Sequence, residues 1–194
     1  AVLASLSSGL AASATQVDVT VAVMSYNNAA FIGQTIDSIL SQESVRVEVL
    51  VYDDCSKDNS LAVLQGYADE PRLQYEVNAQ NLGMTGNYNK CVAAGSGRYI
   101  VVLGSDDILY PGHLSSLVEA LDANPQAALG YTQCYWIDEQ GARTQYAEHP
   151  GHRPQSYCGG RDEVIDLLSF DNYITPSAVM LRRSALHLVA LPEG

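Results

Sequence analysis

Two pairs of adjacent aspartates are the side chains of this sequence best suited to chemistry. One pair, Asp53 and Asp54, follows an apolar run typical of a buried strand. The other pair, Asp106 and Asp107, follows a second such run. Four carboxylates brought together repel one another, so the cluster persists only with a cation, a hydrogen-bonding ligand or contact with water. Oxygen ligands without histidine or cysteine favour Mn²⁺ or Mg²⁺, ions that keep several waters and bridge to substrate phosphates.

Either pair alone is also typical of a turn or a helix cap, which is the alternative reading for each. Two pairs at the ends of two strands favour a functional site instead. A divalent ion on Asp107 would let an acidic protein hold a diphosphate, and would neutralise charge on a departing diphosphate. The chain has a formal net charge of −12, which repels a phosphate backbone and argues against nucleic acid as a partner.

The elements that must position these aspartates alternate between strand-like and helix-like patterns. Short apolar, β-branched runs predict strands over residues 19–25, 45–52, 72–77 and 98–103. Apolar residues at helical spacing predict helices over residues 31–40, 61–67, 85–94 and 114–121. Four such alternations are typical of an α/β fold with a mostly parallel central sheet and helices on both faces.

Ligands of open α/β sheets bind beyond the carboxyl ends of the strands. The first predicted strand delivers Ser25, Tyr26 and Asn27 to that edge. The second strand delivers the first aspartate pair there, and the fourth delivers Ser105 together with the second pair. We therefore expect all of these residues to meet in one site. Tyr26 is either a core aromatic or a platform on which a base stacks.

The remaining segments are less regular. A strand is predicted over residues 127–137, a hairpin turn over 139–141, a loop over 148–160, a short helix over 161–170 and an apolar segment over 178–181. Arg182 and Arg183 are either a grip for phosphate or a surface pair. The cysteines have no metal-knuckle spacing and indicate free thiols rather than disulfides; they are Cys55, Cys91, Cys134 and Cys158.

The chain divides into a short leader and one domain. Residues 1–16 are rich in Ala, Ser and Leu but lack the basic residues of a signal peptide, so we interpret them as a linker or a vector-derived remnant. Residues 17–194 form the domain. Because no apolar run approaches the roughly 18 residues of a membrane span, we expect a cytoplasmic protein without a transmembrane segment in this chain, free or peripheral at the inner face of the membrane.

Three motifs, in this order and at these spacings, resemble the large bacterial family of inverting, GT-A-fold glycosyltransferases, the family 2-like enzymes. The first is VTVAVMSYN at residues 19–27, and the second is VEVLVYDDCSKDNS at 47–60. The third is NLG at 81–83, followed by Asn89 and by GRYIVVLGSDD at 97–107. The resemblance runs from about residue 17 to the end of the chain and implies a GT-A fold with a Rossmann-like N-terminal half.

The resemblance also implies residue roles. Tyr26 lies against the nucleotide base, and Asp54 accepts a hydrogen bond from the imide N–H of uracil or thymine, which favours UDP- and dTDP-sugars. Ser25, Asn27, Asp53 and Ser105 complete the nucleotide site. Asp106 lies near the ribose or the metal, and Asp107 ligates Mn²⁺ or Mg²⁺. The implied activity is sugar transfer, of the hexosyltransferase class, from this donor to a saccharide or lipid-linked acceptor with inversion, in polysaccharide or glycolipid synthesis.

Four positions depart from the family pattern. Met24 stands where the family often has proline, and Tyr88 where many members have arginine. Cys55 replaces a common glycine, so the turn after the first aspartate pair must form without free access to positive φ. Gly104 replaces an aspartate, which weakens the expectation of a metal without excluding it.

An inverting transferase also needs a general base to deprotonate the acceptor hydroxyl. In the family this carboxylate follows the stretch that residues 178–183 resemble. Asp162, Glu163 and Asp171 do not match its position. We therefore expect the domain to be incomplete at its C-terminal end, the base to lie beyond Gly194, and the isolated chain to be inactive or nearly so.

The main alternative is a nucleotide-sugar-binding or regulatory domain of the same fold without turnover. A phospho-acceptor receiver domain would need its acidic pair after the first strand and a single aspartate after the third, which this sequence does not have. A dinucleotide dehydrogenase would need GxGxxG after a strand, and no such motif occurs.

Overall fold

The computed structural model describes residues 16–147 and 174–188, and within them a six-stranded sheet carries the candidate site. The strand order is β3-β2-β1-β4-β8-β5. Its parallel strands are β1 (Val19–Ser25), β2 (Val47–Asp53), β3 (Leu73–Val77) and β4 (Tyr99–Gly104). Strand β8 (Val179–Arg182) runs antiparallel to β4, and β5 (Leu129–Tyr131) runs antiparallel to β8.

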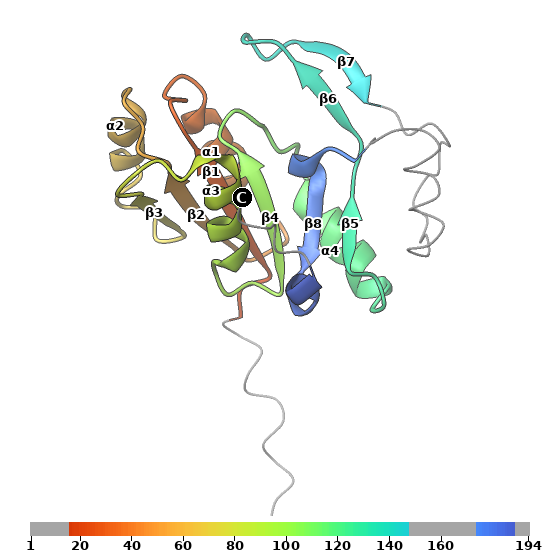
Figure 1. The fold of residues 1–194 in the computed structure, drawn as a ribbon. Helices are drawn as coiled ribbons and strands as arrows, with labels where there is room; N and C mark the ends of the chain where they lie inside the picture. The colour runs from red at the N-terminus through yellow and green to blue at the C-terminus, as the bar shows by residue number, and fades with distance from the viewer. Residues whose placement is uncertain (1–15, 148–173, 189–194) are drawn as a thin grey trace, which may run out of the picture.

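Helices cover both faces of this sheet (Figure 1). On one face, α1 (Ile32–Leu40), α2 (Ser60–Gln65) and α4 (His113–Ala123) pack in the larger apolar cluster. On the other face, α3 (Gly83–Ala93) packs in a smaller cluster. Strand residues alternate between the two clusters, as Val21 and Ala22 do, which is why the strands read as continuous apolar runs. The predicted α/β fold with a mostly parallel sheet is confirmed.

The strand predicted over residues 127–137 is wrong as a single element. Residues of β5 pair in the main sheet, whereas β6 (Cys134–Ile137) pairs with β7 (Arg143–Ala147) in a separate two-stranded hairpin. The chain leaves the main sheet between β5 and β6. The strand-like run of residues continues across this point, so the sequence pattern does not reveal the change of partner. The hairpin turn predicted at 139–141 is confirmed, since Gly141 N donates to Asp138 O at 2.9 Å.

Short 3-10 turns flank the last described strand: η1 (Pro176–Ala178) precedes β8 and η2 (Arg183–Leu188) follows it. The loop predicted over 148–160 and the helix predicted over 161–170 lie outside the described residues. Among the helices that the structure describes, none is both long and apolar enough to traverse a bilayer.

Candidate active site at the carboxyl edge of the sheet

The predicted strand ends lie side by side because β1 pairs with both β2 and β4. Ser25 is level with Asp53 in the β1–β2 register, and Met24 is level with Gly104 in the β1–β4 register. The ladder continues one residue further on each side, where Asp54 N donates to Ser25 O at 2.7 Å and Ser105 N donates to Met24 O at 3.0 Å. The two aspartate pairs therefore emerge at one edge of the sheet.

Asp53 is committed to the turn that follows β2. Its carboxylate is buried and accepts hydrogen bonds from Ser56 N at 2.9 Å, Ser56 Oγ at 2.6 Å and Ser25 Oγ at 3.2 Å. Cys55 inside this turn has φ +65°, the conformation that the family's glycine adopts more easily. Asp53 and Ser25 thus stabilise this turn, and their predicted part in the nucleotide site remains a prediction.

Asp54 holds the start of α3. Its buried carboxylate accepts hydrogen bonds from Leu82 N at 2.8 Å, Gly83 N at 3.0 Å and Asn78 Nδ2 at 2.8 Å. A negative charge at a helix N-terminus is favourable, and these donors compensate its burial. Its predicted contact with the base remains a prediction. The loop that Asp54 organises is the NLG motif, so two motifs far apart in the sequence form one structural unit.

Tyr26 is half exposed, so the alternative that it is a core aromatic is wrong. Asn27 beside it has φ +51° and accepts a hydrogen bond from Lys57 N at 2.7 Å. The loop after β1 also contains Asn28, whose Nδ2 donates to Ser105 Oγ at 2.8 Å. Sequence reasoning missed this asparagine, which links the ends of β1 and β4. Tyr26 is thus free of the core and available for stacking at the edge where the strands end.

Asp106 and Asp107 converge above the end of β4. A Cβ placed on Gly104 would lie 3.0 Å from Asp106 Oδ1 and 2.7 Å from Asp107 Oδ2, so both carboxylates crowd the same point. Burial raises the pKa of the Asp107 carboxyl above its ordinary value, and the charge of Asp106 adds to that rise. The glycine that departs from the family pattern makes room for this convergence.

These two carboxylates fit a hydrated divalent cation. Within the part of the chain that the structure describes, no group of three or more His, Cys, Asp or Glu residues could hold a metal by itself. A pair of carboxylates is nevertheless the share that a protein gives to Mg²⁺ or Mn²⁺ when water and substrate phosphate complete the shell. Burial, with the charge of Asp106 beside it, raises the pKa of Asp107, so its negative charge is costly without a cation.

The comparison with known sequences decides the family. The sequence profile described as Glycosyl transferase family 2 matches residues 20–188, most of the chain. The chain belongs to glycosyltransferase family 2. Its relatives include the succinoglycan biosynthesis protein ExoO of Rhizobium meliloti, 42% identical over 55% of this chain and 30% of that protein. A GalNAc(5)-diNAcBac-PP-undecaprenol β-1,3-glucosyltransferase of Campylobacter jejuni is 32% identical over 75% of this chain and 47% of that protein.

Solved structures place this family 2 domain in the GT-A fold. Staphylococcus aureus TarS, crystallised with UDP-GlcNAc, superposes with a TM-score of 0.72 at 18% identity, covering 90% of this chain and 48% of that one. The Pyrobaculum calidifontis mannosyltransferase PcManGT, in complex with GDP-Man and Mn²⁺, gives 0.65 at 19% identity, covering 92% and 48%. The chain thus spans less than half of each of these relatives and neighbours.

Ser177 of this glycosyltransferase domain contacts the candidate site, and sequence reasoning missed it. It comes from η1, and its hydroxyl donates a hydrogen bond to Asp107 Oδ2. This hydrogen bond lowers the pKa of Asp107, against the effects of burial and of Asp106. No local signal marks Ser177, since it lies 70 residues beyond its partner.

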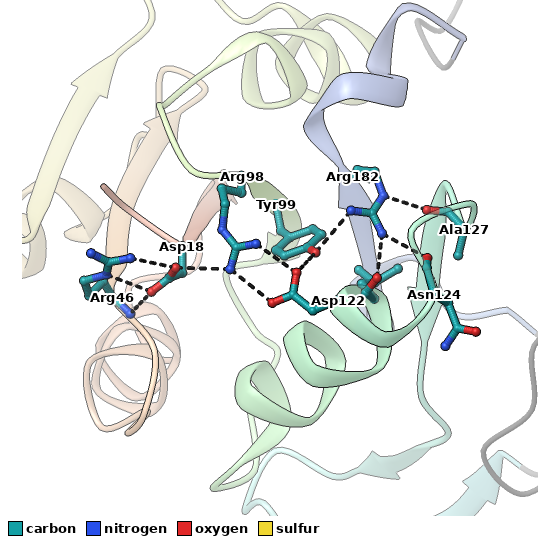
Figure 2. Close-up of polar contacts among 9 residues, drawn as sticks. Asp18, Arg46, Arg98, Tyr99, Asp122, Asn124, Ala127 and Arg182 are labelled. Atoms are coloured by element: carbon teal, nitrogen blue, oxygen red, sulfur yellow. Dashed lines mark hydrogen bonds and ion pairs between the residues drawn. The ribbon is translucent and has the colours of Figure 1, made fainter. Parts of the chain in front are cut away.

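Both readings of the arginine pair are wrong, because each guanidinium binds backbone carbonyls away from the aspartates. Arg182 donates to Leu121 O at 2.7 Å, Asn124 O at 3.1 Å and Ala127 O at 2.8 Å, around the C-terminus of α4 (Figure 2). Arg183 binds Ala94 O and Gly97 O in the same manner after α3. Both fix helix ends to the sheet.

The remaining predictions divide by whether their residues are described. Cys55, Cys91 and Cys134 are free thiols, as expected, whereas Cys158 lies outside the described residues. The residues weighed as bases, Asp162, Glu163 and Asp171, also lie outside them, so the expectation of a base beyond this chain remains a prediction.

Proposed function

We propose that this domain transfers a sugar from a nucleotide-diphosphate sugar, UDP- or dTDP-linked, to a saccharide or lipid-linked acceptor with inversion and with the help of a divalent metal. The biological process would be the synthesis of a bacterial polysaccharide or glycolipid. Supporting this, one relative is named for succinoglycan biosynthesis and another as a glucosyltransferase. A neighbour of the same fold binds UDP-GlcNAc, and another binds GDP-Man with Mn²⁺.

The observation that carries the proposal is the convergence of Asp106 and Asp107 beside an exposed aromatic ring at one sheet edge. In an acidic protein, an unneutralised carboxylate pair would repel a diphosphate. With a cation the same pair attracts it. Asp107, supported by Ser177, and Asp106 would hold Mn²⁺ or Mg²⁺, and the bound ion would supply Lewis-acid stabilisation of the leaving diphosphate.

The nucleoside would lie over the ends of β1 and β2, with its base stacked on Tyr26. Asp54 Oδ2 accepts one protein hydrogen bond, from Gly83 N, and a carboxylate oxygen has room for a second donor. The imide N–H of uracil or thymine supplies such a donor and cytosine does not. Guanine also has a ring N–H, so GDP belongs in the test beside UDP.

The test is thermal unfolding of the chain with nucleoside diphosphates and Mn²⁺. We expect UDP with Mn²⁺ at saturating concentration to raise the melting temperature by roughly 5–10 °C. The rise should vanish with a chelator and should be much smaller with CDP. Because Asp107→Asn removes the metal ligand, it should lose the rise, whereas Asp69→Asn on the exposed turn after α2 should keep it.

Two outcomes count against the proposal. No change with any nucleoside diphosphate and metal would show that the edge does not bind a donor. A rise that survives Asp107→Asn would mean that the nucleotide binds without the predicted metal, so the metal-assisted part would fail.

A further inference from the structure

Four aromatic side chains remain exposed on or beside the β6–β7 hairpin, which stands on the side of the sheet towards which β4 runs (Figure 1). They are Tyr110, Tyr135, Trp136 and Tyr146, each at least 40% exposed. A lone hairpin is marginally stable, so aromatic pairing between its strands has a structural role. Pairing between the strands does not explain why the rings are exposed to solvent. Exposed aromatic rings at a sheet edge can bind a ligand.

Three of these rings form a continuous face with an arginine. Tyr135 and Tyr146 are cross-strand partners with ring centroids 4.7 Å apart. The guanidinium of Arg143 lies 4.5 Å from the ring centre of Tyr135 and 5.0 Å from that of Tyr110. Arg143 Nε also donates to Tyr110 Oη at 2.8 Å. Because Tyr110 follows Asp107 by three residues, this aromatic face is fastened to the loop that carries the paired carboxylates.

A pocket of about 190 Å³ lies between the hairpin turn and the same loop. Its apolar wall is made by Phe31, Ile108 and Ile137, and its carboxylates are those of Asp106, Asp138 and Glu139. This volume is below the roughly 300 Å³ at which pockets for drug-sized ligands begin, so it suits a single small ring.

The charge of the pocket defines its ligand class. None of the described residues that line it is basic, so phosphate and other anions are repelled. A sugar ring is neutral, offers hydroxyl donors to carboxylates and has apolar C–H faces for apolar and aromatic walls. The pocket also shares Asp106 with the proposed metal site, so its occupant would lie beside the donor.

We propose that this pocket is the acceptor subsite and that it binds one neutral sugar unit. The inference rests on the proposed function, because an acceptor presupposes sugar transfer. It assigns acceptor binding to residues of this chain rather than to a segment beyond it.

The experiment is amide NMR of the isotopically labelled 194-residue chain, titrated separately with glucose, galactose, mannose, N-acetylglucosamine and N-acetylgalactosamine. With at least one sugar, we expect saturable shifts at Ile108, Glu139 and Gly141, with dissociation constants on the order of millimolar. Inorganic phosphate should leave these amides unmoved. If none of the five sugars moves them, the proposal is overturned.

Two variants of the turn form a matched pair. Glu139→Lys removes a carboxylate that lines the pocket and should weaken sugar binding by roughly tenfold or more, the loss of one hydrogen bond to a charged group. Gln140→Lys changes the adjacent residue, which does not line the pocket, and should bind as the wild type does. Equal loss in both variants would overturn the subsite.

A parallel titration with UDP and Mn²⁺ separates this proposal from the previous one. The nucleotide should move amides at Tyr26, Asp54 and Asp107 and leave the turn unchanged. Sugar shifts at the turn without nucleotide shifts at the strand ends would refute the donor site and leave a saccharide-binding pocket. Nucleotide shifts without sugar shifts would refute only the acceptor subsite.

Discussion

The negative charge of the Asp107 side chain lies in an environment that destabilises it. Its carboxylate is partly buried, lies beside Asp106, and receives a stabilising hydrogen bond from Ser177. The net effect raises its pKa in the folded chain. A group whose folded-state pKa exceeds its unfolded value favours folding when it is protonated, and this contribution is lost as the pH rises through the folded-state pKa. The metal-free protein therefore bears a cost at neutral pH that a cation would remove.

This predicts that Asp107→Asn is more stable than the wild type in the absence of metal at about pH 7, by about 0.5–1 kcal/mol. The amide keeps the shape of the side chain and removes the charge. Because the pKa of Asp107 lies above its unfolded value of 3.8, the difference should shrink as the pH falls towards 3.8 and the carboxyl takes up its proton. Urea unfolding with a chelator across this range measures it.

Asp69→Asn is the control, since Asp69 lies on an exposed turn and its substitution should leave the unfolding curve unchanged at every pH. If Asp107→Asn were less stable than the wild type at neutral pH, the carboxylate would have compensating partners, and the argument for a cation would weaken.

At the scale of elements, α4 depends on a strand that arrives late in the chain. After its last turn, Leu121 O accepts from Asn124 N at 3.2 Å and Asn124 O accepts from Ala127 N at 2.9 Å. Arg182 of β8 donates a further hydrogen bond to each of these two carbonyls. The same guanidinium donates to Tyr99 Oη at 3.2 Å, so it also reaches the start of β4 (Figure 2). The cation is favourable at this helix end.

We therefore predict that Arg182→Lys lowers the free energy of unfolding by about 2 kcal/mol, because an ammonium group cannot span the carbonyls that the planar guanidinium reaches. Chemical denaturation measures the change. The control is Arg72→Lys, whose exposed guanidinium pairs with Glu70 and reaches a single helix carbonyl, Leu40 O at 3.1 Å, and which should cost less than about 1 kcal/mol. Equal costs in the two variants would refute the special role of Arg182.

At the scale of the whole molecule, the two edges of the sheet differ in how their charges are compensated. At the amino edge, Asp18, Arg46 and Arg98 each stand immediately before a strand, and Asp122 of α4 completes the row (Figure 2). Signs alternate along this row, with Asp18 paired to both arginines and Arg98 also paired to Asp122. At the carboxyl edge, Asp106 and Asp107 face each other instead. The charges of the amino edge are thus paired with one another, whereas the carboxyl edge is where we propose that a ligand binds.

Asp18 should accordingly show the opposite pH behaviour to Asp107. Hydrogen bonds from Arg46 lower the pKa of Asp18 to about 2, so its contribution is present above the unfolded value of 3.8 and is lost as the pH falls through about 2. Because Arg46 is about half exposed, we predict that Asp18→Asn costs only about 1 kcal/mol at neutral pH. This cost should decline when denaturation is followed from about pH 6 to about pH 3.

Glu119→Gln on the exposed side of α4 serves as the control and should show no such decline. A cost for Asp18→Asn that stays constant with pH would indicate lost packing rather than lost charge pairing.

The sequence by itself determined the parallel sheet and the edge at which its chemistry lies. Apolar periodicity is a property of neighbouring residues, and parallel strands bring their ends to one edge wherever they pair. That both aspartate pairs emerge at one edge of the sheet thus needed no coordinates. The prediction from periodicity was wrong at residues 127–137, because two short strands with different partners form one continuous strand-like run in the sequence.

Only the tertiary structure decided which polar groups form hydrogen bonds that stabilise the fold. Asp53 and Asp54 carry the same charge as Asp107, yet their carboxylates anchor a turn and a helix start. The two arginines of β8 bind carbonyls, and Ser177 reaches Asp107 across 70 residues. The contacts of Ser177 and of the two arginines depend on how β8 returns to the sheet beside β4. A residue's own neighbours in the sequence hold no information about partners so distant.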